Sequence, residues 1–267
     1  MRWKGALSRS MGTTKREQPP IITDGLVVRA FNGVGEADRF VTVLTRDRGL
    51  LRAAARGARR IKSKNGAATQ LLCYSRFRFI PGRDMYIVED AQPIEVFFEL
   101  RSDIEKTALA QYFCELATAL CAADEPQEEA LRLLLNALHL LGTGARDPLL
   151  LKATAEWRLL SLAGYMPDVA ACAGCGKTDG NMGFSAVDGR IFCADCRRDG
   201  ALLPLPAGAV AAVRHVVSCD LARLFSFALP TETAAAFAAA AEQFLKAQLQ
   251  RSFKTLDFYH ELGGTAP

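Results

Sequence analysis

The sequence contains two pairs of closely spaced cysteines, Cys172-Ala-Gly-Cys175 and Cys193-Ala-Asp-Cys196. A C-x2-C pair places two thiolates on one tight turn, and two such pairs at this separation can close a tetrahedron around one zinc ion. Two disulfides, or a chance clustering of cysteines, are the alternative interpretation. Four sulfur ligands leave no open coordination position for a catalytic water. The spacing therefore predicts one structural zinc ion bound by Cys172, Cys175, Cys193 and Cys196.

The composition of the chain limits its class and compartment. The 267 residues are half hydrophobic, which allows a substantial core and predicts two domains. No run approaches the ~20 apolar residues of a membrane span, and residues 1–20 lack the apolar core of a secretory signal. These features predict a cytoplasmic protein with no membrane partner. The remaining cysteines are interpreted as small core residues: Cys73, Cys114, Cys121 and Cys219.

Positive charge is concentrated in the first part of the chain. Residues 1–100 hold 18 Lys and Arg against 10 Asp and Glu, whereas residues 101–267 hold 15 against 19. The densest run, Arg48–Lys64, has seven cations and no acid. A charge run can be a solvated face, but the absence of interleaved acids favours a polyanionic partner such as a phosphate backbone.

Residues 21–98 alternate between short apolar segments and turn signals, which predicts a five-stranded barrel. In the fourth segment, the period of two sends Arg76 and Arg78 to one face and Phe77 and Phe79 to the other. The phenylalanines are expected in the barrel core, with base stacking as the alternative. The expected strands are Gly25–Phe31, Arg39–Thr45, Leu50–Ala55, Leu71–Ile80 and Met85–Pro93.

After residue 100 the apolar period changes to about 3.6, which predicts an all-α domain. Ser102-Asp103-Ile104-Glu105 is typical of a capping box before the first helix. The cysteines follow the third helix, so the metal module is expected as an insertion in the bundle. The predicted fold is α+β and multidomain. Its parts are a disordered leader (1–20), a barrel domain (21–99) and a helical domain (100–267) that contains the zinc-binding module (168–199) and helices near Ala207–Cys219 and Thr231–Gln250.

Several segments resemble the RecO family of bacterial DNA repair and recombination mediators. They are Gly35-Glu36-Ala37-Asp38-Arg39, Arg48–Lys64, Trp157–Pro167 and Phe253-Lys254-Thr255-Leu256. The resemblance implies an N-terminal OB-fold that binds single- and double-stranded DNA, a helical domain with a zinc module, and no nucleotide cofactor or catalytic activity. It also implies that the protein anneals complementary strands in the bacterial nucleoid. With RecR, it would help RecA replace the single-strand-binding protein SSB, whose C-terminal tail would bind the helical domain.

The basic residues of the barrel are the expected DNA contacts, and they should hold phosphates irrespective of base sequence. These residues are Arg39, Arg48, Arg52, Arg56, Arg59, Arg60, Lys62, Lys64, Arg76 and Arg78.

Two other functions fit parts of the sequence. A zinc-ribbon transcription regulator would need a base-reading element such as a helix-turn-helix, and none is identifiable. A nucleic-acid-processing enzyme would need paired carboxylates or an open metal site. Glu36 and Asp38 are the acids nearest the expected DNA face, and we interpret them as ion-pair partners.

The three histidines are isolated from one another and indicate no catalytic pair: His139, His215 and His260.

Overall fold

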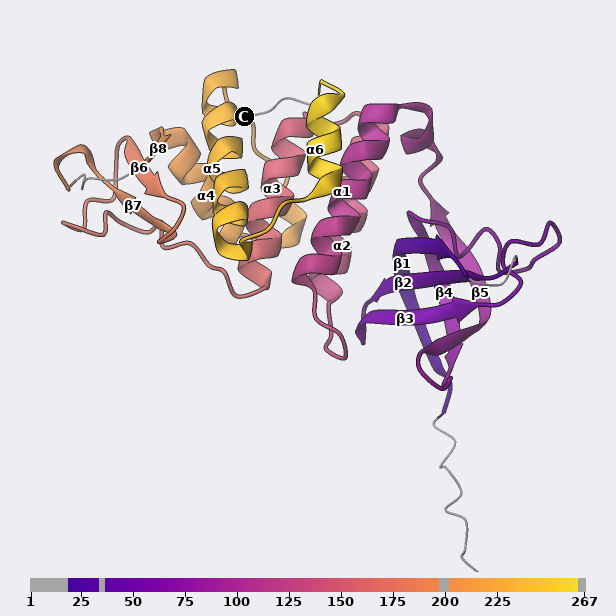
Figure 1. Cartoon of the computed structure of the whole chain (residues 1–267). Helices are drawn as coiled ribbons and strands as arrows, with labels where there is room; N and C mark the ends of the chain where they lie inside the picture. The colour runs from indigo at the N-terminus through magenta and orange to yellow at the C-terminus, as the bar shows by residue number, and fades with distance from the viewer. Residues whose placement is uncertain (1–18, 34–36, 197–201, 264–267) are drawn as a thin grey trace, which may run out of the picture.

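The computed structural model of the chain describes residues 19–33, 37–196 and 202–263. A closed β-barrel is followed by a helical bundle, and a small three-stranded sheet lies at the end of the bundle away from the barrel (Figure 1). This architecture confirms the predicted α+β class, with a five-stranded barrel before a helical domain. Apart from Pro19 and Pro20, the predicted leader lies outside the described residues. No helix in the described part of the chain is long and apolar enough to cross a membrane.

The barrel closes in the strand order β1-β2-β3-β5-β4, with β4 pairing back to β1. All neighbours are antiparallel except β3 and β5, an arrangement of the OB-fold type. Phe77 and Phe79 are fully buried in the barrel core, so they are not a base-stacking platform. The strands are β1 (Ile21–Asn32), β2 (Arg39–Thr45), β3 (Gly49–Ala55), β4 (Cys73–Ile80) and β5 (Tyr86–Val96).

The connection between β3 and β4 is anchored to one end of the barrel. It leaves the sheet at Gly57, whose φ of 63° suits a residue without a side chain. Ala58 and Ala68 are buried in the barrel core. The guanidinium of Arg39 donates to the Gly66 carbonyl at 2.8 Å and to the Thr69 hydroxyl at 2.9 Å. These contacts hold the base of the loop against the barrel. The exposed side chains of the loop therefore start from a fixed backbone.

The first α-helix begins one residue later than the capping box predicts. Asp103 is the N-cap of the first helix, and its carboxylate accepts a hydrogen bond from the Lys106 N–H. The predicted cap, Ser102, is wrong because Ser102 ends a 3-10 turn and donates to the Glu99 carbonyl instead. The helices are η1 (Phe98–Ser102), α1 (Ile104–Leu120), α2 (Glu128–Thr143), α3 (Pro148–Leu162), α4 (Ala207–Ser218), η3 (Leu221–Arg223), α5 (Thr231–Leu249) and α6 (Lys254–Glu261).

A buried charged network joins α1, α3 and α5. Lys152 Nζ lies 3.0 Å from Glu156 Oε1 and 2.7 Å from Glu242 Oε2, and the Tyr112 hydroxyl donates to Glu156 at 2.6 Å. All four side chains are buried. Burial lowers the pKa of Lys152, but attraction to the two carboxylates outweighs it, so the pKa is raised. The network fixes the helices on which the cysteine module rests.

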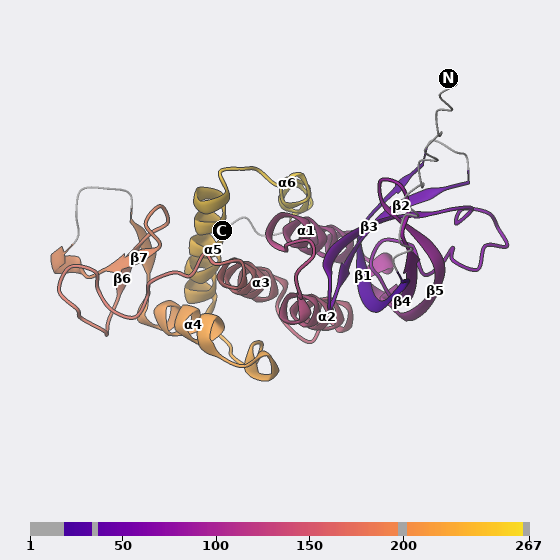
Figure 2. The same cartoon turned by 90° about the horizontal axis from the view of Figure 1, so that it is seen from below.

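The barrel docks on the bundle through the turn between β2 and β3. The Leu50 N–H donates to the Ala122 carbonyl at 3.0 Å. A Cβ added at Gly49 would meet that same oxygen at 2.1 Å, so a larger residue would push the two parts apart. Leu26 and Leu44 extend the helical core onto the barrel, and the barrel lies beside α1 and α2 (Figure 2). From this contact β3 runs toward the free end of the barrel.

Candidate metal centre and nucleic-acid interface

The four predicted cysteine ligands converge in one cluster. The Sγ atoms of Cys172, Cys175, Cys193 and Cys196 all lie within 4.8 Å of one another. In a tetrahedral site with Zn–S bonds of ~2.3 Å, the sulfurs are ~3.8 Å apart. All eight cysteines of the chain are free thiols in this structure, which disfavours the disulfide alternative. The geometry fits a closed four-sulfur site that could hold a metal ion.

Glycines and backbone N–H groups shape this cluster. A Cβ added at Gly174 would lie 2.7 Å from the Cβ of Cys196, which is too close for two carbon atoms. The two turns can approach each other this closely because Gly174 has no side chain. Gly176, with φ of 77°, closes the first turn by donating to the Cys172 carbonyl at 2.9 Å. The N–H groups of Gly174 and Cys193 donate to the Cys172 sulfur at 3.4 and 3.2 Å.

These donors stabilise a thiolate at Cys172. The Cys193 N–H makes the largest contribution, and the pKa of Cys172 is lowered to about 6. The pKa of Cys196 is raised to about 12, chiefly by side-chain hydrogen bonds with Cys175 and Cys193. Four sulfurs this close do not all ionise without a cation, whereas a bound divalent ion deprotonates its thiol ligands. The donor set therefore fits a metal that prefers thiolates.

The cysteine module is attached to the bundle by packing and by backbone hydrogen bonds. Phe184 packs edge-on against Trp157 of α3, with ring centroids 5.4 Å apart. Arg214 of α4 donates to three carbonyl oxygens in segment 169–178 at 2.7 to 2.8 Å. The module lies at the opposite end of the molecule from the barrel (Figure 1). Its short elements are β6 (Met182–Ser185), β7 (Arg190–Phe192), η2 (Ala194–Cys196) and β8 (Leu203–Leu205).

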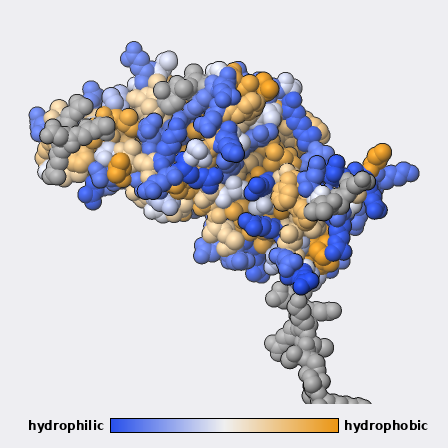
Figure 3. All heavy atoms as spheres, in the orientation of Figure 1, coloured by the Kyte–Doolittle hydropathy of each residue, from blue (hydrophilic) through white to orange (hydrophobic). Residues whose placement is uncertain are grey.

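Five of the predicted DNA contacts are exposed cations whose side chains have no hydrogen-bond or ion-pair partner among the described residues. Hydrophilic side chains cover much of the visible face, including part of the free end of the barrel (Figure 3). Arg52 lies on the outer side of β3, and Arg48 and Arg56 lie in the turns just before and just after this strand. The other two lie on the following loop. We call these five residues the basic track: Arg48, Arg52, Arg56, Arg60 and Lys62.

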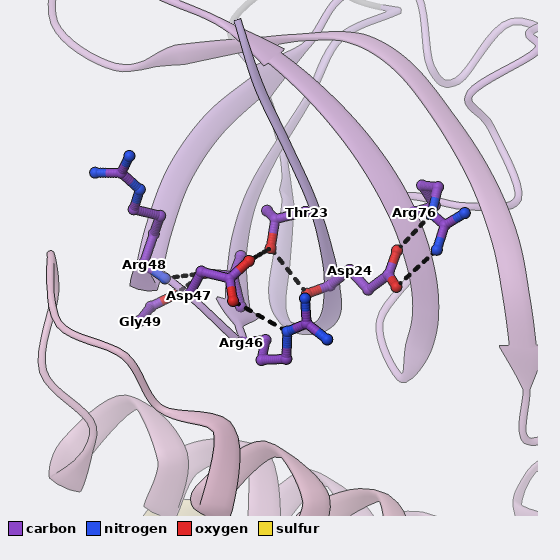
Figure 4. Close-up of polar contacts among 8 residues, drawn as sticks. Thr23, Asp24, Arg46, Asp47, Arg48, Gly49 and Arg76 are labelled. Carbon is purple, nitrogen blue, oxygen red and sulfur yellow. Dashed lines mark hydrogen bonds and ion pairs between the residues drawn. The ribbon is translucent and has the colours of Figure 1, made fainter.

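Three other predicted contacts already pair with carboxylates. Arg76 forms a bidentate pair with Asp24, with N–O distances of 2.8 and 3.0 Å. The hydrogen bond from Arg76 lowers the pKa of Asp24, so this carboxylate stays charged and neutralises its partner. In Figure 4 the Arg48 side chain points away from this carboxylate. The remaining pairs are Arg78 with Glu89, and Lys64 with Asp90 at 2.9 Å.

The last two predicted contacts, Arg39 and Arg59, are tied to the loop. Arg39 supports it as described above, and the exposed Arg59 anchors it through a backbone N–H that donates to the Ala37 carbonyl at 2.9 Å. Asp38 accepts a hydrogen bond from the Gly57 N–H at 2.7 Å. Asp38 thus has a structural role in the same loop, and Glu36 lies outside the described residues. Among the residues that the structure describes, the cysteines form the only cluster of three or more metal-ligating side chains.

Sequence reasoning missed one cation on the barrel face. Arg29 of β1 is exposed and lies opposite Thr42 of β2, which in turn lies opposite Arg52 of β3. Arg29 and Arg52 therefore lie at the two ends of one row across three strands. An isolated arginine after an apolar run gives no such signal in the sequence, because the strand register creates the row.

The fold and the two sites define a class of protein: an OB-type barrel with a basic outer side, joined to a helical bundle that carries a four-cysteine module. The family model for the Recombination protein O N terminal matches residues 20–97, and the model for the Recombination protein O C terminal matches residues 101–257. The chain belongs to the RecO family of DNA repair proteins.

Similar proteins cover almost the whole chain. DNA repair protein RecO of Acetivibrio thermocellus is 35% identical over 242 residues, which is 90% of this chain and 96% of that protein. The protein of the same name from Symbiobacterium thermophilum is 36% identical over 244 residues, with the same coverage of 90% and 96%. DNA repair protein RecO of a Roseiflexus species is 32% identical over 243 residues, 90% of this chain and 85% of that protein. These matches confirm the resemblance inferred from the sequence segments.

Proposed function

We propose that this protein binds single- and double-stranded DNA through its barrel, anneals complementary strands and, with RecR, helps load RecA onto SSB-coated DNA. The observation that carries the proposal is the basic track, whose five exposed cations lack partners among the described residues. A phosphate backbone satisfies such a line of cations independently of base sequence. We assign DNA binding to residues 21–99 and partner binding to residues 100–267. Arg39 supports the loop, and the three carboxylate-paired cations are secondary contacts.

Strand annealing follows from the same surface. Two complementary strands repel through their phosphates, and a surface that neutralises both strands lowers the barrier to pairing. This process breaks no covalent bond, so we assign the protein no catalytic activity. An affinity that depended on base sequence would favour a transcription regulator instead.

We assign one structural zinc ion to Cys172, Cys175, Cys193 and Cys196, because zinc favours tetrahedral thiolate coordination. The ion would cross-link the two turns of the cysteine module. With four sulfur ligands it has no open position for a substrate, so its contribution is to folding.

The acidic C-terminal tail of SSB is assigned to the helical domain. A groove between the end of α2 and the segment around η3 is lined by Leu140, Arg146 and Phe225 among other residues. The exposed cation in this groove would attract the carboxylates of an acidic tail. We assign the protein to the cytoplasm, at the nucleoid, because its proposed partners act on chromosomal DNA.

Annealing of two complementary oligonucleotides that carry a donor and an acceptor dye tests these assignments. The protein should accelerate annealing of naked strands and of SSB-coated strands. Arg146→Glu should slow the SSB-coated reaction alone, because it repels the acidic tail without touching the barrel. A failure to accelerate annealing of naked strands would contradict the proposed function. An equal effect of Arg146→Glu on both reactions would contradict the placement of the tail.

A further inference from the structure

Two phenylalanine rings lie on the outer face of the barrel, beside the basic track. Phe31 of β1 is 51% exposed, and its ring centroid is 5.4 Å from that of the partly buried Phe40 of β2, with the ring planes inclined by 38°. The two residues are directly opposite in the strand pairing, and Phe40 is opposite Ala54 of β3. The small Ala54 side chain adds little cover to the neighbouring ring.

A β-bulge turns Phe31 outward. Val27 faces the barrel core, and strict alternation would send Phe31 to the same inner side. The pairing of β1 with β2 shifts between Val27 and Arg29, so one extra residue is inserted there. Such a bulge reverses the facing of every residue that follows. Ala30 accordingly packs against the barrel core, while Arg29 and Phe31 are exposed.

Cations border this aromatic pair. Arg52 precedes Ala54 by two residues, and Arg56 follows it by two, just past the end of β3. The alternation of a strand places these residues on one side. The guanidinium carbon of Arg29 lies 5.7 Å from the centroid of the Phe31 ring, within the range of a cation–π contact. Three arginines therefore border the pair.

An unpaired nucleic-acid base fits this surface better than an apolar protein segment does. Each base offers a planar face that stacks on an aromatic ring, and the phosphates on either side of it are attracted to cations. An apolar protein segment could bury its side chains against the two rings. It would, however, leave the three arginines without an acidic partner. In a duplex the bases are already stacked and paired, so the rings have no free base to contact.

We propose that Phe31 and Phe40 form a stacking platform for unpaired bases, which gives the barrel a preference for single strands over duplex DNA. The inference rests on the proposed DNA binding by the basic track. The track holds the phosphates of either form of DNA, and the platform adds affinity only where bases are free. Loss of one stacked base by alanine substitution lowers affinity by roughly 5- to 150-fold, equivalent to ~1–3 kcal/mol.

The test compares the variant Phe31→Ala/Phe40→Ala with wild type on three probes of equal length: oligo(dT), an abasic oligonucleotide and a duplex. Fluorescence anisotropy should show at least ~10-fold weaker binding to oligo(dT). Affinity for the abasic strand and the duplex should not change, and the salt dependence should be retained because the cations remain. Phe98→Ala is the matched control, since Phe98 is 66% exposed and has Arg101 5.5 Å from its ring centroid, but lies outside the strands of the barrel.

The outcomes separate the platform from the track. If the double variant bound oligo(dT) as tightly as wild type while substitutions in the basic track weakened binding, the platform would be refuted and DNA binding by the track would stand. If substitutions in neither set weakened binding, both proposals would fail. Should the alanine variant unfold, Phe31→Leu/Phe40→Leu supplies the second arm. That variant keeps apolar side chains but has no ring, so it should still bind oligo(dT) at least ~5-fold more weakly than wild type. Unchanged affinity in the folded variant would contradict stacking.

Discussion

Replacing Cys172 by serine is expected to release the proposed zinc ion and to destabilise the helical domain. Serine provides no thiolate, so the tetrahedron is broken and the metal no longer links the two turns. Structural zinc contributes ~10–16 kcal/mol to folding in small zinc modules. Because Trp157 and Arg214 also hold this module, we expect a partial loss of ~3 kcal/mol or more. At ~2–4 °C per kcal/mol, Tm should fall by at least ~6 °C.

Metal analysis and calorimetry check this result. Wild-type protein should contain one zinc per chain, and Cys172→Ser should contain none. Cys219→Ser is the matched control, because Cys219 is a half-buried free thiol outside the cluster. It should keep the metal and most of the stability. A wild-type protein that held no zinc and had all eight thiols freely reactive would show the assignment to be wrong.

Replacing Arg56, Arg60 and Lys62 together by glutamine is expected to weaken binding to single-stranded DNA by about 100-fold at ~0.1 M salt. Each phosphate contact on a single strand contributes ~0.7 to the slope of log affinity against log salt, which corresponds to ~5-fold per contact at ~0.1 M salt. The slope should therefore fall by about 2.1. Anisotropy titrations at several salt concentrations measure both quantities.

A second triple variant has the same net charge and serves as the control. Lys64, Arg76 and Arg78 each pair with a carboxylate in the protein. A phosphate must break these pairs before it can be held, so their replacement by glutamine should reduce the affinity and the slope much less. If the two triple variants lost the same affinity and slope, binding would follow net charge alone, and the basic track would have no special role.

Local patterns in the sequence predicted the elements whose form depends on near neighbours. The second strand matches its predicted bounds, Arg39–Thr45, because alternation and flanking turns define it within a few residues. The C-x2-C pairs predicted a cluster for the same reason. The 3-10 turn that displaces the predicted cap from Ser102 to Asp103 arises where the chain leaves the barrel. Capping propensities alone do not predict the path of the chain at this point.

The candidate DNA site was predicted less completely. Contacts between strands decide which of its cations are paired with carboxylates, and the sequence does not show these contacts. The sequence could not separate Arg76 from Arg52, since the partner of Arg76 is Asp24 on another strand. It also gave no sign that Phe31 and Phe40 share the outer face, because the bulge in β1 reverses the alternation. Charge density indicates the candidate region, and the strand register shows which of its cations lack a partner in the structure.

The central claim is that the barrel, and not the helical domain, holds the DNA. Photocrosslinking of the full-length protein to a single strand that carries 5-iodouracil, followed by mass spectrometry of the crosslinked peptides, tests it most directly. The crosslinks are expected within residues 29–64, which include the aromatic pair and the basic track. Crosslinks confined to residues 101–267, with none on the barrel, would contradict the account.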